Sequence, residues 1–497
     1  MDLELLLTMA VSLDENRIAV TGPDGRSLTT GQLQAAAGGA ATLLRRASGA
    51  RVAFCDANGL AFPVTLFGSV AARLPFVPLN YRLADTQLGQ IVSDDDLAVT
   101  SAVQQERLGR LGVRRVLDAE GFVDAALAAG ATAYETPIDP DDVALLLYTS
   151  GTTAAPKAAV LRHRHLAAYV IGTVEFGGAE PDEAALLSVP PYHIAGVMNL
   201  LSNLYMGRRV VYLDQFDPTT WLRLVREQSI THAMVVPTML ARIVAVLSDT
   251  PEPVPSLRTI SYGGAKMPAA VIERALRLLP DVAFANAYGL TETSSTIAVL
   301  GPEDHRLALD SPDPVVRARL GSAGLPLPGV EIEVRDEEGR PCVPGGRGDI
   351  YVRGEQVAGE YLGADGTSEG WFATRDRGHL DEAGYVFIEG RADDTIIRGG
   401  ENIAPAEIED VLITHAEIAD CAVVGIDDPE WGQRIAAAVV LVPGAASAPG
   451  DIQSFARDQL RGSKTPDVVV VFDELPYTEN GKLLRRVVRE EIARSSS

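Results

Sequence analysis

Residues Leu146 to Lys157 read Leu-Leu-Tyr-Thr-Ser-Gly-Thr-Thr-Ala-Ala-Pro-Lys. The apolar run Val143–Tyr148 predicts a buried strand that passes directly into a polar loop. The loop holds three hydroxyl side chains around one glycine: Ser150, Gly151, Thr152 and Thr153. Hydroxyls and free backbone amides after a strand suit phosphate oxygens, and a lysine adds positive charge. A polar surface turn explains the composition equally well, and the GxxxxGK[ST] pattern of a Walker loop is absent.

The composition limits the kinds of partner that the protein could bind. The formal net charge is −24, which disfavours nucleic acid and anionic membranes, because both would repel this surface. The three cysteines are far apart, and no run of 18 apolar residues or signal peptide is apparent. We therefore expect a cytoplasmic protein without structural zinc, and the sequence leaves a homodimer open. An anionic small ligand remains compatible, since it needs only a local cluster of donors and cations.

Lysine is rare in this chain, and its placement is informative. Of 43 basic residues only four are lysines, and two of these, Lys157 and Lys482, lie in segments rich in glycine and threonine. A genomic bias toward arginine explains the ratio but not the placement. A compact ammonium group at these two positions indicates a specific role.

Most of the chain alternates short β-branched runs with helical stretches, which is typical of layered α/β proteins. The predicted strands are Arg51–Cys55, Val143–Tyr148, Leu186–Val189, Arg209–Leu213, His232–Val236 and Thr259–Tyr262. The predicted helices are Gly31–Arg46, Leu60–Ala72, His165–Glu175, Thr219–Gln228, Thr238–Ser248 and Pro268–Leu279. From about 330 to 390 short runs between Gly, Pro and Asp indicate a β-rich subdomain. We expect an N-terminal domain over 1–391 and a small mobile C-terminal α+β domain over 392–497.

Seven segments occur in the order that the adenylate-forming, AMP-binding superfamily shows, and the chain resembles its acyl-CoA synthetase branch over nearly its whole length. The segments are Thr149–Lys157, Pro191–Gly196, Tyr262–Ala265, Tyr288–Glu292, Trp371–Asp376 with Glu389–Arg391, Arg398–Glu409 and Pro476–Lys482. Each segment alone is weak. An aspartate beside a turn or a histidine in a core is common and usually structural. Only the occurrence of all seven segments in order favours functional roles for these residues.

The resemblance implies an α/β enzyme that uses ATP, magnesium and coenzyme A, and that passes through AMP-bound intermediates. The implied nucleotide contacts are Thr149, Ser150, Gly151, Thr152, Thr153, Lys157, Gly264, Ala265, Asn286, Ala287, Tyr288, Gly289, Asp376 and Arg391. The implied acyl and CoA contacts are His193, Gly196, Gly263, Gly264, Gly399, Gly400 and Glu401. The implied catalytic residues are Lys482, His193, Glu292 and Thr291, with Glu292 on the metal and Asp393 at a hinge.

Three residues depart from the family pattern. Ala154 and Ala158 stand where the phosphate loop usually has glycine, and Arg375 precedes the ribose aspartate where glycine is usual. If position 154 needs a positive φ, alanine there would cost about 1–2 kcal/mol. All three changes concern ATP, whereas the CoA segment and Lys482 look intact. The alternative to a complete synthetase is therefore a ligase that forms thioesters from preformed acyl-AMP.

The expected substrate is an aliphatic, alicyclic or aryl carboxylic acid. Peptide-synthetase domains hold the substrate amino group with an aspartate in the segment that corresponds to Pro190–Met198, and this segment has no acidic residue. The apolar residues in and beside this segment, Val197, Met198 and Leu200 among them, fit an apolar pocket or an ordinary core. CoA is the expected acceptor, with a separate carrier protein left open. A nucleotide-binding relative without catalysis is the alternative from another class, although Glu292, Asp376 and Lys482 are all present.

Overall fold

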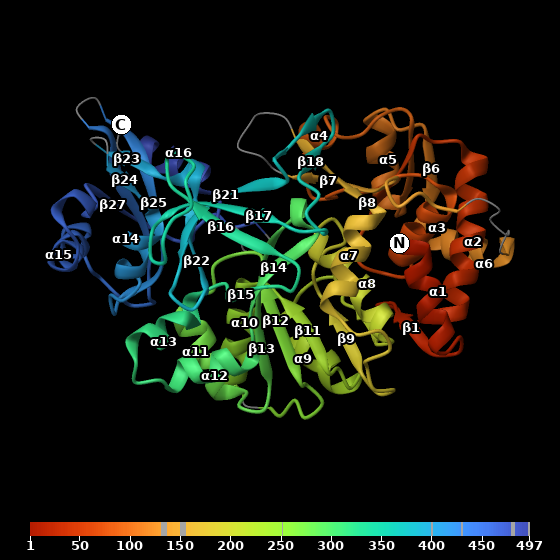
Figure 1. Ribbon diagram of the computed structural model, residues 1–497, viewed down its shortest axis with the longest axis horizontal. Coiled ribbons are helices and arrows are strands. Elements are labelled where there is room, and N and C mark those ends of the chain that lie inside the picture. The colour runs from red at the N-terminus through yellow and green to blue at the C-terminus, as the bar shows by residue number, and fades with distance from the viewer. Residues whose placement is uncertain are drawn as a thin grey trace. The chain divides into compact units, whose positions relative to one another are not determined.

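The computed structural model (Figure 1) describes residues 1–130, 137–149, 156–250, 252–398, 401–428, 431–478 and 483–495. The chain divides into two compact units. The first comprises Met1–Glu331 with Val352–Phe372, and the second comprises Ile332–Tyr351 with Ala373–Ser497. Within the described ranges, no helix is both long and apolar enough to span a bilayer.

The first unit contains a large, mostly parallel sheet. Its described strands, in spatial order, are β15 (Leu325–Pro326), β14 (Ser295–Leu300), β13 (Ala283–Leu290), β12 (Thr259–Gly263), β11 (His232–Val235), β9 (Ala184–Leu187), β10 (Arg209–Tyr212), β1 (Ile18–Thr21) and β2 (Ser27–Thr29). Neighbours among β1, β10, β9, β11, β12 and β13 pair in parallel. In contrast, β2 pairs antiparallel with β1, β14 with β13 and β15 with β14. Because β9 is buried along its whole length, it reads as a continuous apolar run.

A second sheet of the first unit carries the loop segment described above. Its described strands are β19 (Ala364–Asp365), β18 (Glu360–Tyr361), β8 (Lys157–Arg162), β7 (Val143–Thr149), β4 (Phe76–Pro78), β3 (Arg51–Cys55), β5 (Asp96–Thr100) and β6 (Arg115–Asp118). The strands β7 and β8 form an antiparallel pair in which Thr149 lies opposite Lys157. Residues near 360, far along the chain, return to this sheet because Tyr361 pairs with Ala159.

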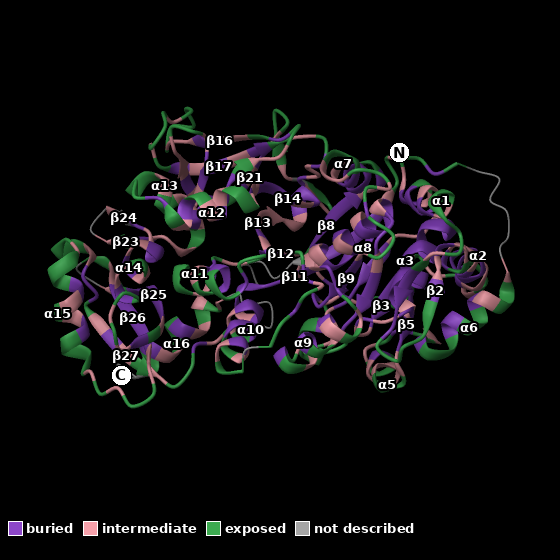
Figure 2. Cartoon of the chain, turned by 90° about the horizontal axis from the view of Figure 1, so that it is seen from below, coloured by how far each residue is buried: buried purple, intermediate pink, exposed green. Residues whose placement is uncertain are grey.

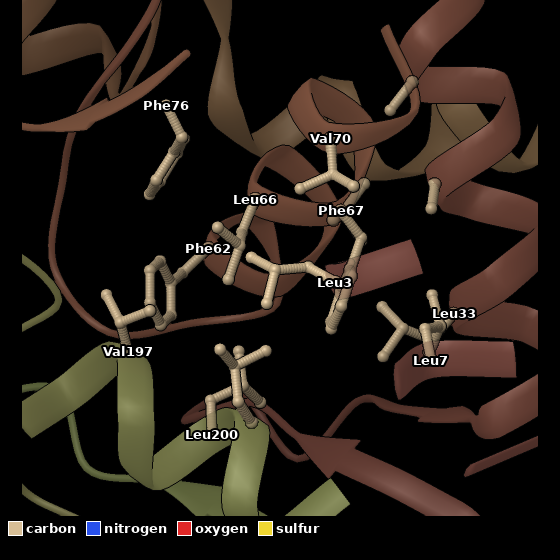
Figure 3. Packing of buried hydrophobic residues seen from close by; sticks show 14 of the residues in the cluster. Leu3, Leu7, Leu33, Phe62, Leu66, Phe67, Val70, Phe76, Val197 and Leu200 are labelled. Atoms are coloured by element: carbon tan, nitrogen blue, oxygen red, sulfur yellow. The ribbon is translucent and has the colours of Figure 1, made fainter. Parts of the chain in front are cut away.

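Helices pack around these sheets and supply the main core. They include α1 (Leu3–Leu13), α2 (Thr30–Ala47), α3 (Ala61–Ala72), α7 (His163–Thr173), α8 (Ile194–Met206), α9 (Pro218–Glu227), α10 (Pro237–Asp249) and α11 (Ala269–Leu278). Figure 3 shows Val197 and Leu200 of α8 beside Phe62 and Leu66 of α3, with Leu3 of α1 nearby. For Val197, Met198 and Leu200 the structure thus supports the ordinary core, because all three are buried in this cluster.

The second unit ends in a small mixed sheet with helices on both faces. Its described strands are β24 (Glu401–Ile403), β23 (Ile396–Arg398), β26 (Gly432–Leu441), β25 (Ile418–Asp428) and β27 (Val468–Phe472). Its helices are α14 (Pro405–Leu412), α15 (Pro449–Gln459) and α16 (Arg485–Ser495). Alternate residues of β25 face opposite sides: Val423 joins the cluster with α14 and α15, and Val424 joins the cluster with α16. Figure 2 shows these central strands as buried.

The strands and helices predicted above are present, with ends that differ from the predicted ones by at most two residues. The strand β3 spans the predicted Arg51–Cys55, whereas β9 lies two residues earlier than predicted and α7 starts and ends two residues early. The helix α8 was not predicted as a helix. The β-rich stretch is confirmed as short strands, which include β16 (Glu331–Arg335), β17 (Gly348–Arg353), β21 (Trp371–Leu380) and β22 (Val386–Arg391).

The compact units divide the chain at other points than the boundary expected after Arg391. Residues Asp376 to Leu380 of β21 pair with Val386 to Arg391 of β22, and α14 packs against β22. This ladder groups residues 373–391 with the C-terminal part of the chain. A mobile C-terminal domain that begins at residue 392 stays a prediction.

Phe62 offers a direct test of the main core. Its side chain is 0% exposed and its ring lies 5.7 Å from that of Phe54 and 6.1 Å from that of Phe76. Phe62→Ala should lower the free energy of unfolding by about 3–5 kcal/mol, because it leaves a cavity among these rings. Urea denaturation measures the loss, and Val103→Ala, at a residue 82% exposed, serves as control. A loss below about 1 kcal/mol for Phe62→Ala would contradict this packing.

Candidate nucleotide and acyl site

The β7–β8 pair positions Lys157 at the start of β8. Lys157 is exposed, lies opposite Thr149 in the ladder and has its Nζ 6.0 Å from the centre of the Tyr361 ring. The residues predicted to bind phosphate between these two, Ser150, Gly151, Thr152 and Thr153, lie outside the described residues, as does Ala154. Their roles therefore stay predictions.

Ala158 adopts an ordinary strand conformation. It is buried in β8, pairs with Tyr148, and its carbonyl accepts a hydrogen bond of 2.9 Å from the amide of Leu362. Its φ is not among the positive values of the described non-glycine residues. The methyl group of Ala158 therefore brings no backbone strain, in contrast to the concern that its sequence raises.

The segment Tyr288–Glu292 runs from the end of β13 into a short 3-10 turn, Thr291–Thr293. The hydroxyl of Thr293 closes the turn, since it accepts from the amide of Leu290 at 3.0 Å and donates to the carbonyl of Ser295 at 2.7 Å. After the turn, Ser294 and Ser295 both have positive φ, of 53° and 99°. Such a strained pair needs support from outside the turn.

Glu292 is the buried carboxylate of this turn. It is 8% exposed, and its Oε1 accepts a hydrogen bond of 2.7 Å from the hydroxyl of Tyr361. Its carbonyl accepts from the amides of Ala358 and Gly359 at 2.9 and 3.1 Å. Sequence reasoning missed Tyr361, because its partner is 69 residues away and nothing in its local sequence marks it.

Adjacent strands bring the next predicted residues together. Gly263 lies opposite Ala287 in the β12–β13 ladder, and Tyr262 lies opposite Asn286, whose amide donates to the carbonyl of Ser322 at 2.9 Å. Gly264 follows with a φ of +86°, which favours glycine. Ala265 continues this turn and is half-buried.

A close backbone approach explains the glycine after Tyr288. A Cβ on Gly289 would lie 1.8 Å from the carbonyl oxygen of Ser295, so no side chain fits there without a shift of β14. Tyr288 and Gly289 flank an irregularity in the β13–β14 register. Close packing against β14 therefore restricts the backbone between Tyr288 and Glu292.

His193 occupies the N-cap position of α8 and is neutral at physiological pH. Its backbone is extended at the N-cap position, and its ring centre lies 4.7 Å from that of Tyr192. Burial lowers the pKa of His193 to about 4. A neutral imidazole suits a shaping and hydrogen-bonding role better than that of a proton donor at pH 7. Gly196 packs in the first turn of α8, where a Cβ would lie 2.6 Å from the carbonyl oxygen of Pro190.

The second unit holds the predicted ribose pair, already assembled. Asp376 and Arg391 lie directly opposite each other in the β21–β22 ladder, with Arg391 Nε 3.0 Å from Asp376 Oδ1. The Asp376 side chain is only 7% exposed, and Arg391 also donates to the carbonyl of Thr374 at 3.0 Å. The guanidinium thus orients the carboxylate.

Arg375, next to this pair, is exposed and has a φ of +62°. This is the left-handed region in which a residue with a Cβ costs about 1 kcal/mol or more. The structure thereby explains why glycine is the usual residue in the family pattern at this position. Arginine in place of the usual glycine at position 375 therefore introduces backbone strain.

The remaining predicted residues surround the start of the C-terminal sheet. Asp393 lies in the 3-10 turn Ala392–Asp394, and Glu401 lies opposite Arg398 in the β23–β24 pair. The guanidinium of Arg485, at the start of α16, pairs with Glu409 at 2.9 Å and with Asp394 at 3.6 Å. Gly399, Gly400 and Lys482 lie outside the described residues.

Glu292 fits a metal ion that arrives with a nucleotide better than a resident one. The described residues include no group of three or more His, Cys, Asp or Glu side chains that could hold a metal. Magnesium, however, is commonly bound by one or two carboxylates together with substrate phosphates. A single buried carboxylate near Lys157 matches that second arrangement.

Comparison with known proteins identifies the family. Residues 8–362 match the family model described as AMP-binding enzyme, and residues 407–482 match the AMP-binding enzyme C-terminal domain. A feruloyl-CoA synthase from Amycolatopsis sp. is 34% identical over 477 residues, which cover 94% of each chain.

Solved structures agree in fold over nearly the full length. ATP-bound MatB from Rhodopseudomonas palustris is 28% identical, with a TM-score of 0.87 and 99% of both chains covered. The o-succinylbenzoate CoA synthetase MenE from Bacillus subtilis, in complex with ATP and magnesium ion, is 27% identical, with a TM-score of 0.82 and coverage of 97% and 98%. The α/β architecture with a large N-terminal and a small C-terminal domain is confirmed. The chain therefore belongs to the AMP-binding enzyme family and is an AMP-forming acid–CoA ligase.

Proposed function

We propose that this protein joins a carboxylic acid to coenzyme A in two steps, through an acyl-AMP intermediate. In the first step a carboxylate oxygen attacks the α-phosphorus of ATP and pyrophosphate leaves. In the second step the CoA sulfur attacks the acyl carbon and AMP leaves with the oxygen that came from the acid. Both steps are governed mainly by positioning and by control of phosphate charge.

The placement of Glu292 and Lys157 beside the same phenol, that of Tyr361, carries this proposal. Glu292 would hold magnesium that enters with ATP, and that ion would neutralise charge on the phosphates. Lys157, with the segment Ser150–Thr153, would hold the β- and γ-phosphates, and Thr291 would contact the α-phosphate. A buried carboxylate and an exposed ammonium that both contact one phenol favour an enzyme over a binding protein that has lost its chemistry.

The other assigned roles follow the same logic. Tyr288 and the backbone from Asn286 to Gly289 would contact adenine, and Asp376 with Arg391 would grip the ribose hydroxyls. His193, Gly263 and Gly264 would shape the acyl and thioester site, and Gly399, Gly400 and Glu401 would border the path of CoA. Asp393 would be the hinge, and Lys482 would stabilise the adenylation transition state.

We infer that the acid is apolar, whether aliphatic, alicyclic or aryl. The segment Pro190–Met198 offers no carboxylate that could bind a substrate amino group. Feruloyl-CoA synthase and succinylbenzoate-CoA synthetase, both similar to this chain, are named for aromatic acids. Val197 and Leu200 do not support the inference, since they pack in the core.

A ligase that uses only preformed acyl-AMP is the second candidate, and Arg375 is the observation that favours it. Its left-handed backbone, beside the ribose aspartate, places strain and a cation where nucleotide binding is proposed. Ala158 weighs against this candidate because it sits unstrained in β8. We place the complete synthetase first.

The test compares two mixtures by mass spectrometry of the CoA thioester. One holds a panel of aryl and aliphatic acids with ATP, magnesium and CoA, and the other holds the matching synthetic acyl-adenylates with CoA. The complete synthetase forms thioester from both mixtures. Thioester from the adenylates alone would support the second candidate, and thioester from neither would contradict both.

Lys482→Ala should separate the two half-reactions. Loss of the ammonium that stabilises the adenylation transition state should slow acid-dependent pyrophosphate exchange by about 10²–10³-fold. Thioester formation from synthetic acyl-AMP should stay close to the wild-type rate, and it serves as the internal control. Equal losses in both half-reactions would show that the role of Lys482 is misassigned.

Arg375→Gly should relieve backbone strain without loss of adenylation. We expect the free energy of unfolding to rise by about 0.5–1 kcal/mol, because glycine accepts the left-handed φ. Acid-dependent pyrophosphate exchange should stay within about three-fold of wild type. Arg377→Gly is the matched control, since its φ is not positive and its pairing with Asp349 would be lost. Exchange that appears only in Arg375→Gly would support the second candidate.

A further inference from the structure

Tyr361 reaches the candidate phosphate site from a distant part of the sequence. The two-residue strand β18 pairs with β8, so that Tyr361 lies opposite Ala159, and the neighbouring amide of Leu362 donates to the carbonyl of Ala158. Glu360, beside it, forms a two-bond ion pair with Arg162 at the other end of β8, at 2.7 and 2.9 Å. These contacts fix the backbone of Tyr361 against the strand that begins with Lys157.

The same segment is bound on its other side to the turn that carries Glu292. The backbone amides of Ala358 and Gly359 both donate to the carbonyl of Glu292. The buried side-chain amide of Gln356 donates to the backbone carbonyls of Thr293 and Thr296 at 3.2 and 2.6 Å. Residues 356–362 therefore join β8 to the turn through backbone hydrogen bonds and through the side chain of Gln356. This segment thus links the strand that begins with Lys157 to the turn that carries Glu292.

The phenol of Tyr361 contacts both functional groups. Its hydroxyl donates to Glu292 Oε1 at 2.7 Å, a length typical of a hydrogen bond to a carboxylate. Its ring centre lies 6.0 Å from Lys157 Nζ, at the limit of a cation–π contact. Among the described residues, no other side chain has a hydrogen bond to the Glu292 carboxylate. One phenol thus stands between the carboxylate and the ammonium.

We propose that Tyr361 is a positioning residue for adenylation, and this rests on the proposed function. Its hydroxyl occupies Oε1 and holds the Glu292 carboxylate in one rotamer, so that Oε2 is presented to a magnesium ion carried by ATP. Its ring keeps the Lys157 ammonium at a fixed place on the phosphate side. Tyr361 itself transfers no proton and touches no reacting atom.

This assignment predicts a specific fault when the hydroxyl is removed. In Tyr361→Phe the ring remains and the fold is kept, but Oε1 loses its donor and the carboxylate gains rotamer freedom. Hydrogen bonds to charged groups are strong. The factor by which magnesium raises the affinity for ATP should therefore fall by roughly ten-fold. Thioester formation from preformed acyl-AMP needs no metal–ATP complex and should be unaffected.

The main readout is binding rather than turnover. Calorimetric titration with the non-hydrolysable analogue α,β-methylene-ATP at a series of magnesium concentrations gives the magnesium dependence of nucleotide affinity. Wild type, Tyr361→Phe, Tyr361→Leu and Tyr351→Phe are compared. Tyr351→Phe is the matched control, because it also removes a hydroxyl from a tyrosine under a cation, with Arg335 4.4 Å from its ring centre.

The half-reactions provide the second readout. In Tyr361→Phe we expect the magnesium concentration for half-maximal pyrophosphate exchange to rise by roughly ten-fold, and thioester formation from acyl-AMP to stay unchanged. Tyr361→Leu should also raise the KM for ATP, since Lys157 loses the ring. Tyr351→Phe should match wild type in every assay.

A double-variant cycle tests whether Tyr361 acts through Glu292. If it does, adding Tyr361→Phe to Glu292→Gln should change the magnesium coupling by less than about two-fold, because the group that it orients is already altered. Unchanged magnesium coupling in Tyr361→Phe, or equal losses in both half-reactions, would overturn the proposal. Neither outcome would contradict the proposed function, because that function is tested by the products that the wild-type protein forms.

Discussion

The hydrogen bonds between residues 356–362 and the turn after β13 hold the phosphate side of the candidate site together. Ser294 and Ser295 occupy left-handed backbone conformations, which cost about 1 kcal/mol or more each. The turn keeps this conformation because Gln356, Ala358 and Gly359 bind its carbonyl groups. Glu292 thus owes its place to a segment that follows it by more than sixty residues.

The pair that we propose to bind ribose is held by strand pairing. Asp376 and Arg391 are opposite each other in an antiparallel ladder, so their pairing is set by register rather than by a turn. This pair belongs to the second compact unit, whereas Glu292 and Lys157 belong to the first. Each part is therefore assembled within its own unit. The hinge that we propose at Asp393 lies within the second unit. Rotation there would keep the Asp376–Arg391 pair, because both residues precede the hinge, but would have to release the packing of α14 against β22.

The sequence predicts the layers and the ordered motifs well, but contacts between distant segments less well. Period and composition place β3 and α3, since their buried faces are continuous apolar runs. The same reasoning could not separate pocket from core for Val197 and Leu200, because an apolar helix face suits both. Tyr361 was missed because its hydroxyl bonds across 69 residues. The strain at Arg375 follows from its φ, and only the family pattern of glycine pointed to it.

Transfer of oxygen from acid to AMP tests the central claim most directly. The acid is labelled with ¹⁸O in both carboxyl oxygens and incubated with the enzyme, ATP, magnesium and CoA, and the AMP is examined by mass spectrometry. Attack of the carboxylate on the α-phosphorus predicts one ¹⁸O atom in each AMP that accompanies a thioester. Thioester formed with unlabelled AMP would contradict an acyl-AMP intermediate, and with it the roles proposed for Glu292, Lys157 and Lys482.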